Sequence, residues 1–271
     1  MFKINNLTYQ YDKTRKALDN VSMDFNKGNI IGIIGSNGSG KSTLFNNLMG
    51  ILKSTEGEIL YNGEQIKYDK KSLYNLRKEV GIVFQDPEKQ IFYSMVYDDI
   101  AFAHRNIGID EKTIKERIHT ALEAVNGLQF IDRPVHNLSF GQKKRVAIAS
   151  VVAMENKLVL LDEPTAGLDP ISTRAIVDII KGLNKRGVKI VISSHDMNLI
   201  YEICDYVYVL NQGVLINEGT REEVFINEEK IDEAGLELPW LVKLHKNMGL
   251  PLFTREEDLY SYWNHREQKT V

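Results

Sequence analysis

Short apolar runs recur along the chain and predict the strands of a buried sheet. The four clearest runs are Ile30–Ile34, Val80–Phe84, Leu158–Leu161 and Lys189–Ser193. Runs of this kind are typical of parallel strands that are covered on both faces. Helical patterns separate them, notably at Thr43–Met49 and at Ile171–Leu183, and the second pattern stops at Arg186-Gly187. This alternation of strand and helix predicts a doubly wound α/β core.

Two other regions depart from the core pattern. Apolar and polar residues mix in short stretches broken by Asn/Gly turns, which predicts antiparallel strands on one flank. These stretches are Leu7–Tyr9, Val21–Phe25 and Glu58–Tyr61. Between Asp86 and Ala153 the spacing becomes helical, with Ile114, Ile118, Leu122 and Val125 at near-helical intervals. We therefore expect an α-helical subdomain, inserted at about 86–153, in a main domain of residues 2–225.

The remaining residues, 226–271, form an acidic and mixed tail with breaks at Pro239 and Pro251, which predicts an extension of short helices. Its aromatic residues, at Leu238–Val242 and Leu259–Trp263, are expected to lie either at a subunit interface or against their own domain.

The amino-acid composition excludes several classes of function and of structure. The 34 Lys and Arg residues nearly balance the 37 Asp and Glu residues, which argues against a dedicated nucleic-acid binder. The single cysteine, Cys204, excludes an internal disulfide and fits a reduced cytosol, and no Cys/His spacing suggests zinc. The sequence has no signal-like start and no run of the ~18 apolar residues that span a bilayer. We expect a chain that is soluble by itself and reaches any membrane through a partner.

The segment Gly35–Ser42 fits the P-loop pattern G-x-x-x-x-G-K-[ST] and follows the first apolar run, as this motif requires. Glycines let backbone N–H groups surround phosphates, Lys41 reaches the β/γ oxygens, and the Ser42 hydroxyl can ligate Mg²⁺ at a helix N-terminus. The motif predicts binding of a nucleoside triphosphate. The expected contact residues are Gly35, Ser36, Asn37, Gly38, Ser39, Gly40, Lys41, Ser42 and Thr43.

The apolar run at Leu158–Leu161 ends in two carboxylates, Asp162 and Glu163. A carboxylate at this end of a buried strand lies over the bound phosphates, so Asp162 can complete the Mg²⁺ shell. Glu163 points differently and can orient or deprotonate the attacking water, because P-loop catalysis depends on positioning and charge stabilisation.

Further segments resemble, in the right order, the motifs of ATP-binding-cassette (ABC) ATPases. Leu138, Ser139, Phe140, Gly141 and Gln142 resemble the signature, Gln85 the Q-loop glutamine, Ala166–Asp169 the D-loop with Asp169, and His195 the switch histidine. Tyr11 resembles the aromatic residue that stacks on adenine, although Tyr9 lies on the same strand face and could serve instead. We interpret Lys143-Lys144-Arg145, after the signature, as a solvated helix face, and the five other histidines as structural or surface residues.

This resemblance, which covers about residues 2–225, implies a P-loop NTPase (RecA-like) core that hydrolyses ATP. It implies catalytic roles for Glu163, His195 and Gln85, and Mg²⁺ ligation by Ser42, Gln85 and Asp162. In this family the signature of one subunit covers the nucleotide of another, so a second ATPase subunit is required, identical or related. Ser139 would then reach the γ-phosphate in trans, and ATP would join the two subunits.

Phe140 departs from the glycine that most ABC signatures carry. Together with the segment Phe84–Phe92, it resembles the ATPase subunits of energy-coupling-factor importers, in particular those of cobalt importers. These subunits bind a transmembrane coupling protein and, with it, a membrane component that carries the substrate. The resemblance implies a peripheral location on the cytoplasmic face of the cell membrane, with no nucleic-acid partner and no direct insertion.

Three alternatives remain at this point. The cargo could be nickel or a vitamin instead of cobalt. A soluble ABC ATPase of translation or DNA repair is a different class, although its usual second cassette, coiled coil or zinc insertion is missing here. A small-molecule kinase or GTPase would use the P-loop alone and would leave Leu138–Gln142 and His195 unexplained, and the guanine-reading Asn-Lys-x-Asp pattern is absent.

Overall fold

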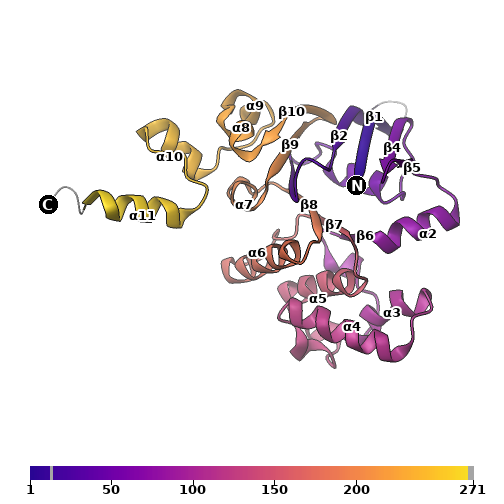
Figure 1. The fold of residues 1–271 in the computed structure, drawn as a ribbon. Helices are drawn as coiled ribbons and strands as arrows, with labels where there is room; N and C mark the ends of the chain where they lie inside the picture. The colour runs from indigo at the N-terminus through magenta and orange to yellow at the C-terminus, as the bar shows by residue number, and fades with distance from the viewer. Residues whose placement is uncertain (13–14, 268–271) are drawn as a thin grey trace.

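Two β-sheets and a layer of helices make up the body of the protein. The computed structural model describes residues 1–12 and 15–267, and Figure 1 shows the helices α3–α5 forming a lobe on the other side of the larger sheet from the N-terminal strands. The doubly wound α/β core, the antiparallel flank and the inserted helical region are all present, as the sequence predicts.

The larger sheet has six strands in the order β10-β9-β3-β8-β7-β6. All neighbours pair in parallel except β10, which pairs antiparallel to β9 at one edge. The strands are β3 (Ile30–Ile34), β6 (Val80–Val83), β7 (Leu158–Asp162), β8 (Lys189–Ser194), β9 (Tyr206–Asn211) and β10 (Val214–Thr220). The first four confirm the predicted strands, with β6 ending one residue earlier than expected, whereas β9 and β10 were not predicted.

The smaller sheet is antiparallel, in the order β2-β1-β4-β5. It contains β1 (Phe2–Gln10), β2 (Lys16–Asp24), β4 (Glu56–Tyr61) and β5 (Glu64–Gln65). The predicted flanking stretches lie in β1, β2 and β4, and the Asn62-Gly63 turn joins β4 to β5 with both residues at positive φ.

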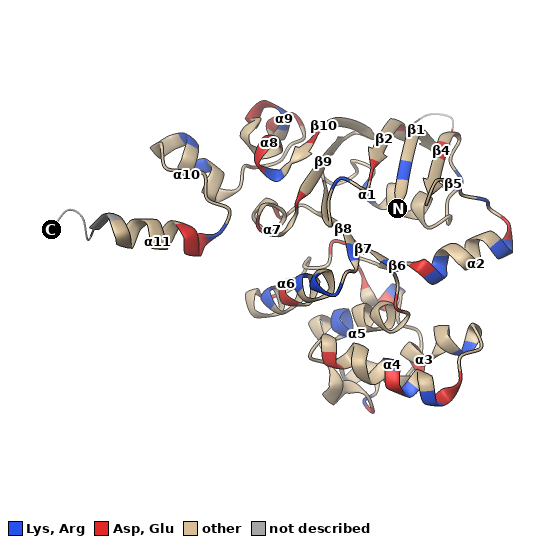
Figure 2. Ribbon diagram, in the orientation of Figure 1, with Lys and Arg blue, Asp and Glu red and all other residues tan. Residues whose placement is uncertain are grey.

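The helices account for most of the remaining chain. They are α1 (Lys41–Leu48), α2 (Lys70–Glu79), α3 (Val96–Asn106), α4 (Glu111–Ala124), α5 (Phe140–Ala153), α6 (Pro170–Lys185), α7 (Met197–Ile203), α8 (Arg221–Ile226), α9 (Glu228–Glu233), α10 (Trp240–Met248) and α11 (Glu256–Glu267). Helices α3, α4 and α5 pack on one another and build the helical subdomain. Figure 2 shows acidic and basic residues interspersed along these elements.

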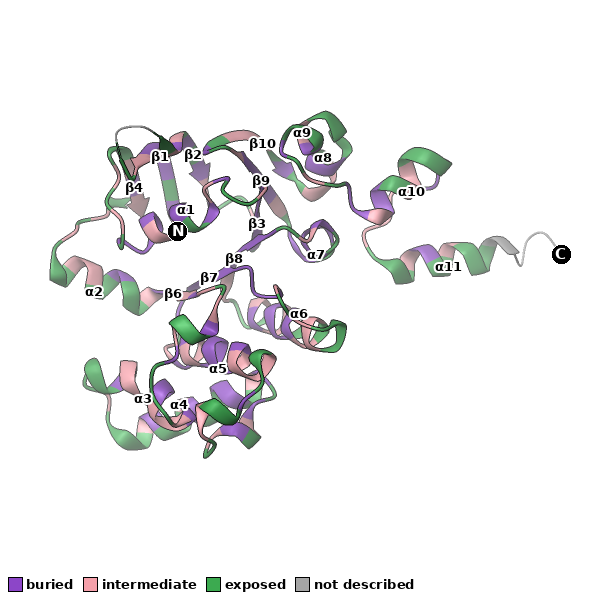
Figure 3. Ribbon diagram, turned by 180° about the vertical axis from the view of Figure 1, so that it is seen from behind, coloured by how far each residue is buried: buried purple, intermediate pink, exposed green. Residues whose placement is uncertain are grey.

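Alternate residues of each central strand pack into two separate hydrophobic cores. Ile31 and Ile33 of β3 point toward the smaller sheet and α1, whereas Ile30 and Ile34 belong to the core formed with the helices α5, α6 and α7. Burial on both faces explains why these strands read as continuous apolar runs. Figure 3 shows this buried centre flanked by exposed outer turns.

The predicted C-terminal extension consists of short helices, and part of it joins the helical-side core. Ile231 of α9 is fully buried, and Leu241 and Val242 of α10 are nearly so. Figure 1 shows α10 and α11 lying beyond α8 and α9, at the end of the molecule far from α2. Within the described residues, every helix is too short or too polar to cross a membrane.

The single cysteine, Cys204, lies at the end of α7 and is completely buried. Burial raises the pKa of its thiol well above the usual range. The residue therefore behaves as a small apolar core residue.

Candidate nucleotide-binding site

A cavity of about 550 Å³ opens where the strands β3, β6, β7 and β8 reach their carboxyl ends. In open parallel sheets this edge is the usual place for ligands. Its lining brings together most of the residues that the sequence singled out: Tyr11, Asn37, Gly38, Gly40, Lys41, Ser42, Thr43, Gln85, Asp162, Glu163 and His195. Segments far apart in the chain thus converge on one site.

The P-loop joins β3 to α1 and leaves the helix N-terminus facing the cavity. Gly40, the residue before α1, has φ +107°, and a Cβ at this position would lie 2.6 Å from the carbonyl oxygen of Ala17, so only glycine fits. Lys41 Nζ donates to the carbonyl oxygens of Gly35, at 2.8 Å, and Ser36, at 3.1 Å. Burial lowers the pKa of Lys41, and the charges of Glu163 and Asp162 oppose that shift. A buried cation at the N-terminus of a helix is suited to hold phosphate.

Asp162 accepts two hydroxyl hydrogen bonds. Ser42 Oγ donates to one carboxylate oxygen at 2.7 Å, and Ser193 Oγ donates to the other at 2.5 Å. The second contact follows from the sheet register, which sets Asp162 of β7 opposite Ser193 of β8. Hydroxyl, carboxylate and the amide oxygen of Gln85, which lines the same cavity, are oxygen donors of the kind that Mg²⁺ prefers. This donor set fits a magnesium ion.

Glu163 sits in a strained backbone conformation next to His195. Its φ of +47° is uncommon for a residue other than glycine and costs about 1 kcal/mol or more. Its side chain is only 7% exposed, and its Oε2 lies 2.8 Å from Nδ1 of His195, which is itself 60% exposed. One buried carboxylate oriented by one exposed histidine can position a water molecule for attack on a phosphate.

The two candidate stacking residues differ in their surroundings. Tyr11 is 64% exposed, lines the cavity and hydrogen-bonds through its hydroxyl to Thr43 Oγ1 at 3.2 Å. Tyr9 packs against the core of the smaller sheet and meets the Tyr11 ring edge-on, with 5.0 Å between ring centroids. The open ring face therefore belongs to Tyr11.

The signature residues lie elsewhere. Ser139 caps α5 through a reciprocal pair of bonds with Gln142, and no residue of Leu138–Gln142 is among those that line the described cavity. Asp169 caps α6 by accepting from the backbone N–H and the hydroxyl of Ser172, and the backbone bond holds the pKa of Asp169 below its usual range. Both helix starts are thus formed, but neither Ser139 nor Asp169 is among the residues that line the described cavity.

Sequence reasoning missed several residues of the site. Ser193 was treated only as part of the segment before His195, although it also accepts from the Glu163 backbone N–H at 3.1 Å. Arg15, Lys16 and Ala17, which line the cavity beside Tyr11, were not selected because nothing in their spacing marks them.

The interpretation of Lys143-Lys144-Arg145 as a solvated face was wrong for its middle member. Lys144 is 1% exposed and donates to the backbone oxygen of Glu163 at 2.7 Å. At helical spacing adjacent residues point in different directions, so three consecutive basic residues cannot share one face.

Comparison with known proteins supports the nucleotide site. Residues 18–166 match the family model described as "ABC transporter". The chain is 45% identical over 269 residues to the "Cobalt import ATP-binding protein CbiO" of Salmonella typhimurium, covering 99% of this chain and 97% of the relative. It is 43% identical over 248 residues to the "Energy-coupling factor transporter ATP-binding protein EcfA" of Methanosphaera stadtmanae, covering 92% and 89%.

A solved structure shares the fold. CbiO1 from Clostridium perfringens, described as part of the ABC transporter complex cbiONQ, is 41% identical and superposes with a TM-score of 0.78. The similarity covers 90% of this chain and 98% of that one.

Proposed function

Because this chain belongs to the ABC transporter family of ATP-binding proteins, we propose that it is the ATPase subunit that drives cobalt uptake through an energy-coupling-factor importer. Binding and hydrolysis of ATP follow from the family. The choice of cobalt as the cargo is supported by the 45% identity to a cobalt import ATP-binding protein over nearly the whole of both chains.

ATP binds with its phosphates on the P-loop, Gly35–Ser42, and with its base against Tyr11. Lys41 already faces carbonyl oxygens in the loop, so it exchanges these bonds for β- and γ-phosphate oxygens at little cost in desolvation. Tyr11 is the stacking residue in preference to Tyr9, because its ring is exposed at the cavity. The Thr43 hydroxyl holds the Tyr11 phenol in place.

Hydrolysis depends on the carboxylates at the end of β7. Glu163 orients and deprotonates the attacking water, and His195 fixes the Glu163 carboxylate through their 2.8 Å contact. Gln85 faces the same space from the segment after β6. Ser42, Asp162 and Gln85 would hold Mg²⁺, which supplies charge neutralisation for the phosphates. Ser193 keeps the Asp162 carboxylate in position.

The working unit contains two ATPase subunits, identical or related. Ser139 and Phe140 are exposed at the start of α5, yet no residue of the signature segment Leu138–Gln142 lines the described cavity of its own chain. A helix N-terminus with a serine cap can bind anions, so Ser139 of each subunit completes the γ-phosphate site of the other. Loss of the γ-phosphate on hydrolysis then loosens the pair.

A transmembrane coupling protein and a substrate-carrying membrane component complete the importer. The ATPase subunit stays peripheral, on the cytoplasmic face of the cell membrane, and does not contact the cargo. Movement of the helical subdomain relative to the core, across the Gln85 segment, transmits the nucleotide state to the membrane partner.

The test is to co-express the chain with the membrane components encoded beside it, to purify the complex through a tag on this chain, and to measure ⁵⁷Co²⁺ uptake by the cells. We expect the complex to be recovered and uptake to depend on ATP. Lys41→Ala should reduce ATP affinity on the order of 30- to 100-fold, because a charge-assisted contact is lost. The same variant should reduce uptake to background while the complex still assembles.

Two results would contradict the proposal. Uptake of nickel or a vitamin without cobalt would overturn the cargo while leaving the importer. A chain that hydrolyses ATP but never co-purifies with the membrane components would overturn the importer role itself.

A further inference from the structure

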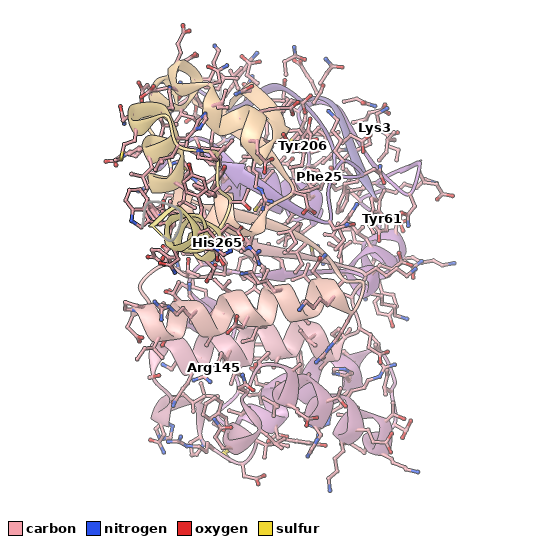
Figure 4. All side chains as sticks on the ribbon, turned by 60° about the vertical axis from the view of Figure 1, so that its left-hand side comes forward. Lys3, Phe25, Tyr61, Arg145, Tyr206 and His265 are labelled. Atoms are coloured by element: carbon pink, nitrogen blue, oxygen red, sulfur yellow. The ribbon has the colours of Figure 1, made fainter. Side chains whose placement is uncertain are left out.

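Lys144 is a buried cation inside the helical subdomain, and it points at the catalytic edge of the core. The basic neighbours on α5 point elsewhere: Lys143 pairs with Glu88 at 2.5 Å, and Arg145 donates to the carbonyl oxygen of Asn126 at 3.1 Å. Figure 4 shows Arg145 in the lower, helical lobe, away from the sheet. Lys144 alone of the three is turned toward β7, where its Nζ reaches the backbone oxygen of Glu163 at 2.7 Å.

Burial of a charged lysine side chain costs free energy unless the charge is paired or hydrogen-bonded. Burial lowers the pKa of Lys144 to about 8, against the opposing charges of Glu163, Asp162 and Asp86. An apolar side chain of similar length would fill the same space without that penalty. Packing alone therefore does not explain why an amine stands at this position.

The bond from Lys144 holds the Glu163 carbonyl group from outside the loop that contains it. The Glu163 backbone N–H donates to Ser193, and its carboxylate contacts His195. Its carbonyl oxygen accepts from the Ala166 backbone N–H at 3.2 Å, within the same loop, and from the Lys144 amine of α5 at 2.7 Å. Because the residue has φ +47°, its peptide groups relax toward ordinary backbone geometry unless both are held. Rotation of this peptide would swing the carboxylate away from the phosphate side.

Phe140 covers the same contact from the signature. It lies one helical turn before Lys144, and its ring centroid is 5.5 Å from Lys144 Nζ. The ring also lies against Gly167, where an added Cβ would be 3.4 Å from Phe140 Cε1. The first turn of α5 is thus packed on the segment that connects Glu163 to Asp169. The aromatic residue that replaces the usual glycine shields the Lys144 bond from water, which strengthens it.

We propose that Lys144 is a positioning residue for hydrolysis: it holds the Glu163 backbone in its left-handed conformation and so ties the general base of one nucleotide site to the helix whose start, Ser139, serves the other site. This inference rests on the proposed ATPase mechanism. Displacement of α5 when the signature engages a nucleotide moves the Lys144 amine, and with it the Glu163 peptide, so each site senses the occupation of its neighbour.

The experiment compares ATP hydrolysis by the wild-type chain, Lys144→Met and Lys144→Gln. Lys144→Met keeps length and packing but removes the donor. It should lower kcat at least tenfold, since a displacement of about 1 Å of a catalytic group has effects of this size or more, and should change the KM for ATP less than threefold. Lys144→Gln retains an N–H donor and should recover at least a third of the wild-type kcat.

A matched control and a double variant complete the design. Lys115→Met makes the same substitution on the exposed face of α4 and should leave kcat and KM unchanged. In a Glu163→Gln background, Lys144→Met should have no further effect on the residual rate. Fluorescent ATP-analogue binding and the unfolding midpoint of Lys144→Met should match the wild type.

Several outcomes overturn the inference. These are a wild-type kcat for Lys144→Met, equal losses for the Met and Gln variants, or a loss of ATP binding in parallel with kcat. If Lys144→Met does not fold, the kcat of Lys144→Gln decides, and a rise in its KM without a fall in kcat counts against positioning. A wild-type chain without ATPase activity would instead contradict the proposed function, so the two failures are distinguishable.

Discussion

Asp162 and Glu163 are neighbours in the chain, but their surroundings give them different chemistry. Asp162 accepts from two serine hydroxyls, Ser42 and Ser193, which orient its two carboxylate oxygens at a site suited to a cation. The Glu163 carboxylate contacts His195, and the Glu163 carbonyl oxygen accepts a hydrogen bond from Lys144. The positive φ of Glu163 accounts for the difference, because it turns the second carboxylate out of the strand geometry that the first one keeps.

Removal of the His195 side chain should impair the orientation of the Glu163 carboxylate without impairing the binding of ATP. In His195→Ala the Glu163 carboxylate loses its 2.8 Å partner, so we expect kcat to fall on the order of 100-fold, with the ATP dissociation constant changed less than threefold. Phosphate release under saturating ATP measures the first quantity, and fluorescent-nucleotide titration measures the second. His195→Gln keeps an N–H donor and should be less impaired, whereas an alanine variant with wild-type turnover would show that the histidine is only structural.

Most residues at the cavity could be predicted from sequence because their motifs are local. Gly35–Ser42 are contiguous, and Asp162, Glu163 and His195 directly follow apolar strands. Ser193 and Lys144 could not be predicted with equal ease. Ser193 reaches Asp162 through the pairing of β7 with β8, and Lys144 reaches Glu163 through the packing of α5 on the core. Such partners depend on tertiary contacts that no spacing along the chain encodes.

At the scale of elements, burial on both faces makes some strands easy to predict from the sequence. Other strands were not predicted. Strands β3, β7 and β8 carry continuous apolar runs because helices or a second sheet cover both faces. The edge strand β10 leaves all but one of its residues at least partly exposed and contains Asn217, Glu218 and Gly219, so its polar composition resembles a loop. Strand β9 carries an apolar run, Tyr206–Leu210, which could have been recognised as the sixth strand.

Two glycines should respond to alanine in opposite directions. In β6, a Cβ at Gly81 would lie 2.2 Å from Val151 Cγ1 and 2.6 Å from Asn156 Oδ1, so Gly81→Ala forces α5 away from the sheet. We expect it to lower the free energy of unfolding by about 1–3 kcal/mol. Gly182 lies within α6 with no neighbouring atom near its Cβ position, so Gly182→Ala should raise the free energy of unfolding by about 0.5–1 kcal/mol.

Urea unfolding followed by circular dichroism measures both variants against the wild type. Because the same substitution is made twice, any difference reflects the local environment. Equal shifts for the two variants would contradict the tight contact between β6 and α5.

At the scale of the whole molecule, the sequence boundary between residues 225 and 226 falls inside α8, and the core continues past it. Ile231, Leu238, Leu241 and Val242 are buried with the helices of the main domain. Among the described residues beyond Gly249, Leu250 and Leu259 are buried in this core, whereas Leu252, Phe253 and Tyr262 pack against it and are only partly buried. The extension therefore has an inner part that stabilises the domain and an outer part that projects from it.

Truncation distinguishes these two parts. A chain that ends after residue 225 should lose at least about 3 kcal/mol of stability, because several buried aliphatic side chains are removed. A chain that ends after residue 249 should unfold within a few degrees of the full-length protein. Thermal melts of the three chains provide the measurement. Equal melting temperatures for the full chain and the chain that ends after residue 225 would show that α9 and α10 contribute nothing to the core.

The burial of Cys204 makes this chain a convenient background for spectroscopic labels. It is the single cysteine of the sequence and is inaccessible in the folded protein, so thiol-reactive probes should leave the native chain unmodified. A cysteine placed at an exposed position, such as Ile171 beside Asp169, which is 82% exposed, would then be the sole site of attachment. Spin labels at that position on two copies would report their separation through the ATPase cycle without removal of the native cysteine.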